Sequence, residues 1–384
     1  MLLNPAFMYA ATWMLVLFSY SLRLSHLLDP LRPATVVLVA GTSLAFILGW
    51  MIESLPNYGR LASTKINLDV LGAVIESGRV GKRLKTIWII FGLSISLEIA
   101  YFRGVPVLSL MGIGSDIGYA DWGIPGFHGL VNALFYTGCA LTFARILLGS
   151  SGRMFPLMML SIAYPIITMS RQVLISLLVQ YLLLYFSIRR PSPRVFVRAG
   201  VVFAAVLLIF GYLGDVRSGR DSIIGLADPS FEYPDWLPSA FIWIYIYLST
   251  PLNNVNFNID IRPHYLPIET AGSFIPSFAR QGFLSSFGES QQWDLVSDYF
   301  NVGSLLQSLL TDFGVGGAIA FTLLCGVVFS RLRRLAAESP AAFFSVIVLL
   351  HGIALSFFAN LLFHLVFMFE ILAIIWVVRQ GRRQ

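Results

Sequence analysis

The sequence predicts an all-α, polytopic integral membrane protein with about ten transmembrane helices, in a range of about nine to eleven. Of its 384 residues, 57% are hydrophobic and only 12% are charged, whereas a soluble domain has about 25% charged residues. Apolar runs long enough to cross a bilayer recur along the chain, and basic residues gather in short segments between them. We therefore expect a single membrane domain over residues 1–384.

The first apolar run is interpreted as a membrane helix and not as a cleaved signal, because it has no basic segment before it and no small-residue cleavage site. Ser170, Arg171 and Gln172 separate the fifth run from the sixth, and Ala359 and Asn360 divide a stretch too long for one span. The ten runs are 5–22, 34–52, 86–102, 128–148, 154–170, 172–188, 199–214, 301–330, 341–359 and 361–378.

The orientation follows from the basic residues. With ten spans and a cytoplasmic N-terminus, 18 of the 26 Lys and Arg residues, including all three lysines, fall on one side. The positive-inside rule makes that side the cytoplasm, which places the C-terminus and a loop at 53–85 there. The outer side then has a loop at 103–127 and a large loop at 215–300. The net charge of +6 thus reflects topology and does not indicate a nucleic-acid partner.

Residues 214–299 form the one long polar stretch of the sequence, with four arginines, ten acidic residues and no lysine. Within it, 239–251 is apolar and aromatic but only about 13 residues long, which is short for a span. We interpret it as a re-entrant or interfacial helix, because a crossing there would place the Arg331–Arg334 cluster outside. The alternative is an eleventh span.

The basic residues expected on the outer side are all arginines. Arginine stays charged and binds phosphate oxygens through two parallel hydrogen bonds, which suits a diphosphate. We therefore expect an anionic ligand at this surface. The eight are Arg23, Arg32, Arg103, Arg171, Arg217, Arg220, Arg262 and Arg280.

Arg171 is the most informative of them, because apolar sequence flanks it at the tip of a tight helical hairpin. A charge there is costly unless it faces water or a ligand; the alternative is an interfacial arginine that reaches the headgroups. Arg103 ends the third span before a loop rich in Gly and Pro, which permits close approach to a ligand but is also ordinary in loops.

Arg217 and Arg220 are three residues apart and can share one face of a turn, although Asp215 and Asp221 are equally able to neutralise them. Arg280 is a further candidate ligand of the substrate.

A candidate general base is His264, which follows Arg262 and lies near Asp260 in sequence. A neighbouring carboxylate orients such a base, but a lone histidine in a loop is more often a polar surface residue. The acidic residues show no metal-ligand pattern, and Cys139 and Cys325 lie in apolar runs, so neither a metal site nor a disulfide is predicted.

Five ionisable residues stand out inside the predicted spans. Such residues are functional candidates by default, but we favour structural roles for most of them. They are Glu98, Asp312, His351, His364 and Glu370.

Five short motifs add a family resemblance: RGVPVLS, SRQVLISLLVQYLLLYF, GDVRSGR, YLSTPLNNVN and SLLQSLLTDFGVGGAIA. With the span count, they make the chain resemble the Wzy-type O-antigen, or oligosaccharide repeat-unit, polymerases. The resemblance implies a membrane glycosyltransferase at the periplasmic face of the bacterial inner membrane. Such an enzyme transfers a growing glycan from undecaprenyl diphosphate onto a lipid-linked repeat unit, in the synthesis of lipopolysaccharide O-antigen or a related surface polysaccharide.

The resemblance further implies no cofactor and, by analogy with O-antigen ligases, no obligatory metal. The implied partners are the undecaprenyl-diphosphate-linked oligosaccharide, membrane lipids and a protein that regulates chain length. Arg103, Arg171, Arg217 and Arg220 match the functional arginines of the family by context.

The chemistry suits these residues. Arginines stabilise the charge that develops on a lipid-diphosphate leaving group, and a base takes the proton of the acceptor hydroxyl. The expected catalytic residues are His264, Arg171 and Arg217. The expected substrate ligands are Arg103, Arg171, Arg217, Arg220 and Arg280.

Two alternatives stay open. One is an O-antigen ligase or another glycosyltransferase that uses lipid-linked sugars; the polyprenyl-phosphate-sugar enzymes place catalytic acids in the first outer loop, where this sequence has only Asp29. The other is a flippase or transporter of lipid-linked oligosaccharide. Transporters usually have inverted repeats and sites at the membrane midplane, and no internal repeat is evident in the sequence.

Overall fold

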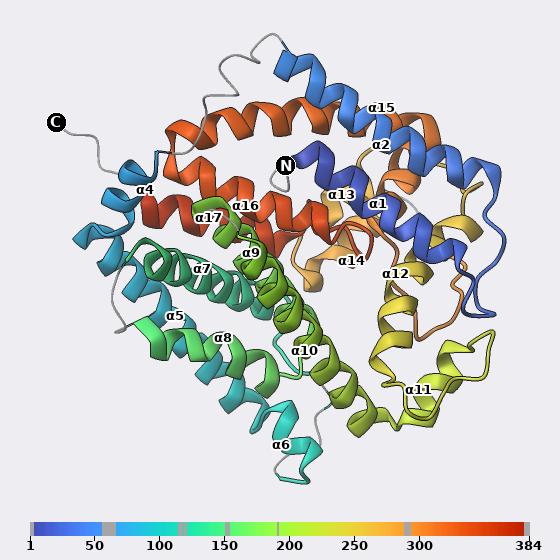
Figure 1. Ribbon diagram of the computed structural model, residues 1–384, viewed down its shortest axis with the longest axis horizontal. Helices are drawn as coiled ribbons and strands as arrows, with labels where there is room; N and C mark the ends of the chain where they lie inside the picture. Colours follow the sequence, from blue (N-terminus) through green and yellow to red (C-terminus); the bar gives the residue numbers. More distant parts are fainter. Residues whose placement is uncertain are drawn as a thin grey trace.

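A computed structural model describes residues 4–55, 67–113, 118, 121–149, 154–189, 192–287 and 293–379. Helices account for all the regular elements in these ranges, apart from one isolated bridge between Ser25 and Pro229. Figure 1 shows the helices packed side by side around a common interior. The all-α prediction is therefore confirmed.

Each of the ten predicted spans coincides with a helix. The helices are α1 (Pro5–Ser21), α2 (Pro33–Ser54), α4 (Leu68–Ile75), α5 (Gly78–Phe102), α6 (Pro106–Leu110), α7 (Phe127–Leu148), α8 (Phe155–Ile167), α9 (Arg171–Ile188), α10 (Pro193–Ser218), α11 (Arg220–Ala227), α12 (Ala240–Phe257), α13 (Ile268–Gly272), α14 (Ser277–Ser285), α15 (Leu305–Glu338), α16 (Pro340–Ala354) and α17 (Leu365–Val378).

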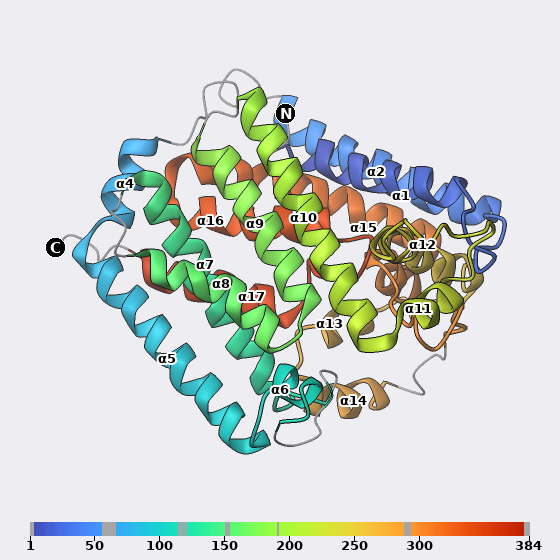
Figure 2. The same ribbon diagram turned by 60° about the horizontal axis from the view of Figure 1, so that its bottom comes forward.

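Five stretches of the described chain are long and apolar enough to cross a membrane, which makes this a multi-pass membrane protein. They are Pro33–Ser54, Gly78–Ser109, Phe127–Leu148, Arg171–Ile188 and Leu305–Glu338. Crossings by the other helices, and the side on which each loop lies, stay predictions. Figure 2 places α4 at one end of the molecule and α11 and α12 at the other.

The closest approach between long helices joins α2 to α15, and glycines make it possible. A Cβ atom on Gly49 would lie 2.0 Å from the carbonyl oxygen of Leu323, and one on Gly326 would lie 2.3 Å from that of Phe46. Beside the contact, the Phe46 ring stacks on Tyr9 with 4.7 Å between ring centroids. Small residues that let two backbones meet are the usual basis of helix association in membranes.

The helix α15 is broken at Gly314, where φ is 66° and ψ is −178°. Only glycine adopts this backbone conformation without strain. Pro263 fills the break, since its side chain would lie 3.2 Å from a Cβ at Gly314. On the N-terminal side of the break, the Asp312 carboxylate accepts hydrogen bonds from the backbone N–H groups of Glu269 (2.7 Å) and Thr270 (2.9 Å). Asp312 therefore anchors α13, a structural role as favoured from the sequence.

The predicted 13-residue segment at 239–251 is too short. It belongs to α12, an 18-residue helix of which twelve residues are buried. The sequence conceals its second half, NNVNF, because asparagine is a residue of turns and helix ends. In the structure the side chain of each of these asparagines forms hydrogen bonds to a neighbouring segment, and the helix continues through them.

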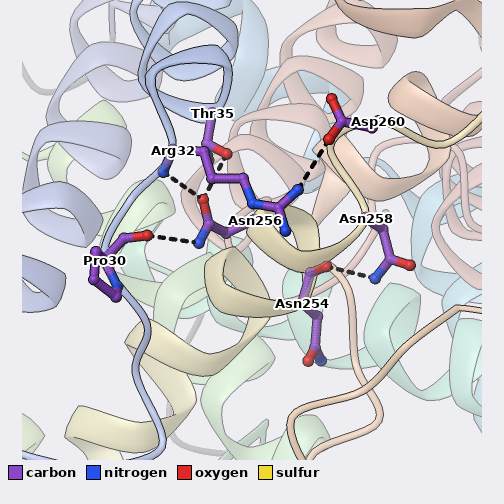
Figure 3. Close-up of polar contacts among 7 residues, drawn as sticks. All are labelled: Pro30, Arg32, Thr35, Asn254, Asn256, Asn258 and Asp260. Atoms are coloured by element: carbon purple, nitrogen blue, oxygen red, sulfur yellow. Dashed lines mark hydrogen bonds and ion pairs between the residues drawn. The ribbon is translucent and has the colours of Figure 1, made fainter.

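Asn256 shows how this works (Figure 3). Its amide nitrogen donates to the Pro30 carbonyl (3.1 Å), while its oxygen accepts from the Arg32 backbone N–H (2.8 Å) and the Thr35 hydroxyl (2.7 Å). Three further asparagines act similarly. Asn253 binds backbone groups of residues 27 and 29, Asn254 those of residues 296, 300 and 302, and Asn258 that of residue 294. We call these four residues the asparagine clasp.

The glycine contact between α2 and α15 gives a stability prediction. Gly326→Ala should lower the free energy of unfolding by about 1–3 kcal/mol, because the new methyl group meets backbone atoms that are unable to move aside. Thermal unfolding of the purified protein in detergent measures this. The matched control is Gly92→Ala in α5, where a Cβ would meet no atom within 4 Å. Equal melting temperatures for the two variants would contradict the close packing.

Candidate functional site

Arg171 lies where three helices meet. It is the first residue of α9, and Ser170 before it does not cap the helix with its side chain. The guanidinium lies over the Trp243 ring of α12, 5.5 Å from the centroid. It also reaches α10, because a Cβ on Gly214 would lie 3.0 Å from one of its nitrogens. Positive charge and the first N–H groups of a helix together favour a bound anion.

Arg217 lies in the last turn of α10. Its side chain falls outside the part of the chain that the structure describes, so its predicted catalytic role stays a prediction.

Arg220 is held by the segment that leads into α12. Its guanidinium donates to the carbonyl oxygens of Pro234 (2.9 Å), Asp235 (3.1 Å) and Leu237 (3.2 Å), and lies over the Tyr233 ring. Its carboxylate partner is Asp235, at 3.3 Å. A local ion pair was one of the two interpretations from the sequence, although with other aspartates. Most of the donors of Arg220 are committed within the protein, and diphosphate binding by it stays a prediction.

His264 lies at the break in α15. Its backbone N–H donates to the Thr311 carbonyl at 2.9 Å, and its side chain is half-buried. The expected carboxylate partner, Asp260, is instead paired with Arg32 at 2.9 Å. The acidic neighbour of His264 is Asp312, which already binds α13. No carboxylate that orients the ring is therefore found where the sequence suggested one.

Arg103 and Arg280 lie on elements that border a cluster around His128, a residue that sequence reasoning missed. Arg103 ends α5 in a left-handed conformation, with φ of 55°, and its side chain is exposed. Arg280, on α14, pairs with Glu269 at 3.5 Å. Trp122 connects the end of α5, next to Arg103, to the cluster. Its indole N–H donates to the Gly104 carbonyl (3.3 Å), and its ring meets the His128 ring edge-on.

The centre of this cluster is a pair formed by Glu98 and His128. The carboxylate of Glu98 is fully buried, and one of its oxygens lies 2.9 Å from Nδ1 of His128. The other oxygen accepts from the Ile124 backbone N–H at 3.1 Å. One sequence signal was available: Glu98 is one turn from the end of the third predicted span, and His128 begins the fourth. Two helices joined by one loop usually bring such ends together.

The remaining intramembrane residues have structural contacts. Both oxygens of Glu370 accept from the Gln180 amide, at 3.1 and 3.2 Å. His351 is buried edge-on against Phe367, and His364 caps α17 by accepting from the Val366 N–H at 3.4 Å. A group of three or more His, Cys, Asp or Glu residues able to hold a metal ion does not occur within the described ranges.

The fold and its long apolar helices define a helical, multi-pass membrane protein with polar clusters at the ends of its helices. No family model, curated protein or solved structure matches the chain.

The contacts of Arg220 give a prediction that separates a structural arginine from a ligand-binding one. Arg220→Ala and Arg220→Lys should both loosen residues 233–238, at a cost of about 1–3 kcal/mol, because Nη2 binds the three carbonyl oxygens while Nη1 binds the Asp235 carboxylate, and a single ammonium nitrogen does not span both sets of contacts. Limited proteolysis of the purified protein measures the effect. Arg32→Ala is the control, since its exposed pair with Asp260 should contribute at most about 1 kcal/mol. Unchanged proteolysis in Arg220→Lys would contradict the structural role.

Proposed function

We propose that this protein is a polysaccharide polymerase. It transfers a growing glycan from undecaprenyl diphosphate onto a lipid-linked repeat unit at the periplasmic face of the bacterial inner membrane. The reaction is glycosyl transfer with a lipid diphosphate as leaving group. The proposal combines the resemblance of the motifs with the placement of the arginines.

The observation that carries the proposal is the environment of Arg171. The Arg171 guanidinium lies over the Trp243 ring and beside the backbone at Gly214. Arg171 is also the first residue of α9, where the helix dipole favours an anion. A charge fixed before the reaction stabilises a leaving diphosphate better than one that must first be oriented. Apolar residues of α9 follow directly, which suits a polyprenyl chain beside the diphosphate.

A ligase that caps another acceptor would use the same donor and the same arginines, and it differs in the acceptor alone. A flippase is the candidate of another protein class. The break in α15 favours a flippase, because transporters use interrupted helices at their binding sites. However, Asp312 beside the break is occupied by two backbone N–H groups of α13. The charged residues of this protein lie mainly at helix ends, which favours the enzyme.

Arg171 is the residue to test first. In a strain that lacks the chromosomal gene, Arg171→Ala should abolish long glycan chains, with a loss of about 10²–10³-fold in polymerisation rate. Arg171→Lys should also be impaired. An ammonium group has no planar face to stack on Trp243, and it does not form two parallel hydrogen bonds to a diphosphate. Glycan length on gels and protein level in membranes are the measurements. Single-unit products should persist, whereas loss of a flippase would remove them as well.

The control is Arg23→Ala, an exposed arginine that we expect on the same side. Normal chain lengths in Arg171→Ala at a normal protein level would contradict the proposal.

A second prediction tests the position of the Arg171 guanidinium without changing its charge. Gly214→Ala places a methyl group 3.0 Å from a flexible side chain, so the fold should persist while the guanidinium moves. We expect shorter glycan chains and a rate lowered about 10-fold, since small misplacements of positioned groups are costly. Gly200→Ala, on the same helix, meets no atom within 4 Å and is the control. Equal chain lengths in the two variants would argue against a fixed Arg171.

A further inference from the structure

The pair of Glu98 and His128 has the arrangement of an oriented base. Glu98 is fully buried, and a buried carboxylate is stable only when it is bound. It meets this need with the Ile124 N–H at 3.1 Å and Nδ1 of His128 at 2.9 Å. Because a carboxylate accepts hydrogen bonds, Nδ1 carries the proton. In the neutral ring Nε2 then holds the free lone pair.

The loop before α7 fixes the ring. Gly123 has φ of 109°, and a Cβ there would lie 2.6 Å from Cγ of His128. Trp122 meets the ring edge-on, with 5.1 Å between centroids. Gly126 has φ of 78°, and a Cβ atom added to it would lie only 2.7 Å from the Phe278 ring of α14. The absence of a side chain at Gly126 therefore lets Phe278 pack closely. Gly123 therefore lets the backbone approach the ring of His128, while Gly126 lets α14 pack on the same loop.

The ring is nevertheless accessible, since 24% of the His128 side chain is exposed to solvent, whereas the exposed fraction of the Glu98 side chain is 0%. A partly exposed ring on a buried carboxylate is the geometry in which a base meets substrate on one side and its orienting group on the other. By contrast, the ring of His264 makes no hydrogen bond to a described residue.

The elements that border the pair carry further charged and titratable groups. Arg103 ends α5 next to Gly104, whose carbonyl binds Trp122. Arg280 follows Phe278 on α14, and Tyr164 of α8 lies electrostatically close to Glu98. At the start of α17, Val366 packs on Gly129 and is capped by His364. Arg103 and Arg280 thus lie on elements that border the ring, and Arg280 is paired with Glu269. Binding of a diphosphate by these two arginines stays a prediction.

We propose that His128, positioned by Glu98, is the general base that activates the acceptor hydroxyl; this inference rests on the proposed polymerase function. The acceptor oxygen forms a bond to the anomeric carbon of the growing glycan, and the bond from that carbon to the diphosphate oxygen breaks. The hydroxyl proton passes to Nε2 of His128. The lipid diphosphate leaves with the electron pair, and Glu98 stabilises the imidazolium that results.

The test uses full-length protein in a strain that lacks the gene, together with membrane vesicles supplied with lipid-linked repeat units. His128→Asn is the decisive variant, because its amide replaces Nδ1–H toward Glu98 but has no atom in place of Nε2. It should reach the membrane at the normal level and lose polymerisation by about 10²–10⁴-fold. His26→Asn, an exposed histidine in the loop after α1, is the matched control and should form normal chains.

Glu98→Gln tests the positioning role separately. It should lower kcat at a normal protein level, because the amide does not stabilise the imidazolium that forms during proton transfer. A merely structural glutamate would lower protein level and leave the rate per protein molecule unchanged. Should His128→Ala fail to accumulate, His128→Asn still decides the question.

The outcomes separate the two proposals. If the strain without the gene still forms long chains, the polymerase function itself is wrong. If wild type restores the chains and His128→Asn restores them equally, the function stands and the assignment of the base is overturned. Loss of chains in His264→Asn together with normal chains in His128→Asn likewise overturns it, and transfers the role to His264.

Discussion

The asparagine clasp is the interaction on which the end of the molecule around α12 depends. Peptide groups next to a membrane must be hydrogen-bonded within the protein, because little water is available to them. Three asparagines of α12 and Asn258, which follows it, bind two distant segments, and each amide both donates and accepts. Without them, backbone groups at 27–32 and 294–302 would lose these partners, at about 0.5–1.5 kcal/mol for each hydrogen bond.

The clasp also explains why polar residues from all along the chain meet at the ends of helices. It ties the connection between α1 and α2 to α12, whose Trp243 in turn meets Arg171. The cluster around His128 depends on a different support, the approach of α14 to the glycines before α7. Arginine and histidine are thus placed by separate parts of the scaffold, which is the usual way in which a rigid fold positions a site.

Much of the fold could be predicted from the sequence, because length and apolar composition decide where helices form in a membrane chain. The second half of α12 could not, since its asparagines are poor helix formers until tertiary partners bind them. The contacts of Arg220 were only partly predictable: Asp215 and Asp221 are nearer in sequence, whereas Asp235 is nearer in space. The His128 pair was missed because a separation of 30 residues gives no local pattern.

Gly314 has a mechanical consequence. A helix transmits force along its ladder of hydrogen bonds, and α15 loses that continuity at Gly314. Its first turns are fastened to α13 through Asp312, whereas its long remainder is fastened to α2 through Gly326. The two parts of α15 are therefore joined through one residue with a non-helical backbone, and a displacement of α13 reaches the α2–α15 contact only through Gly314.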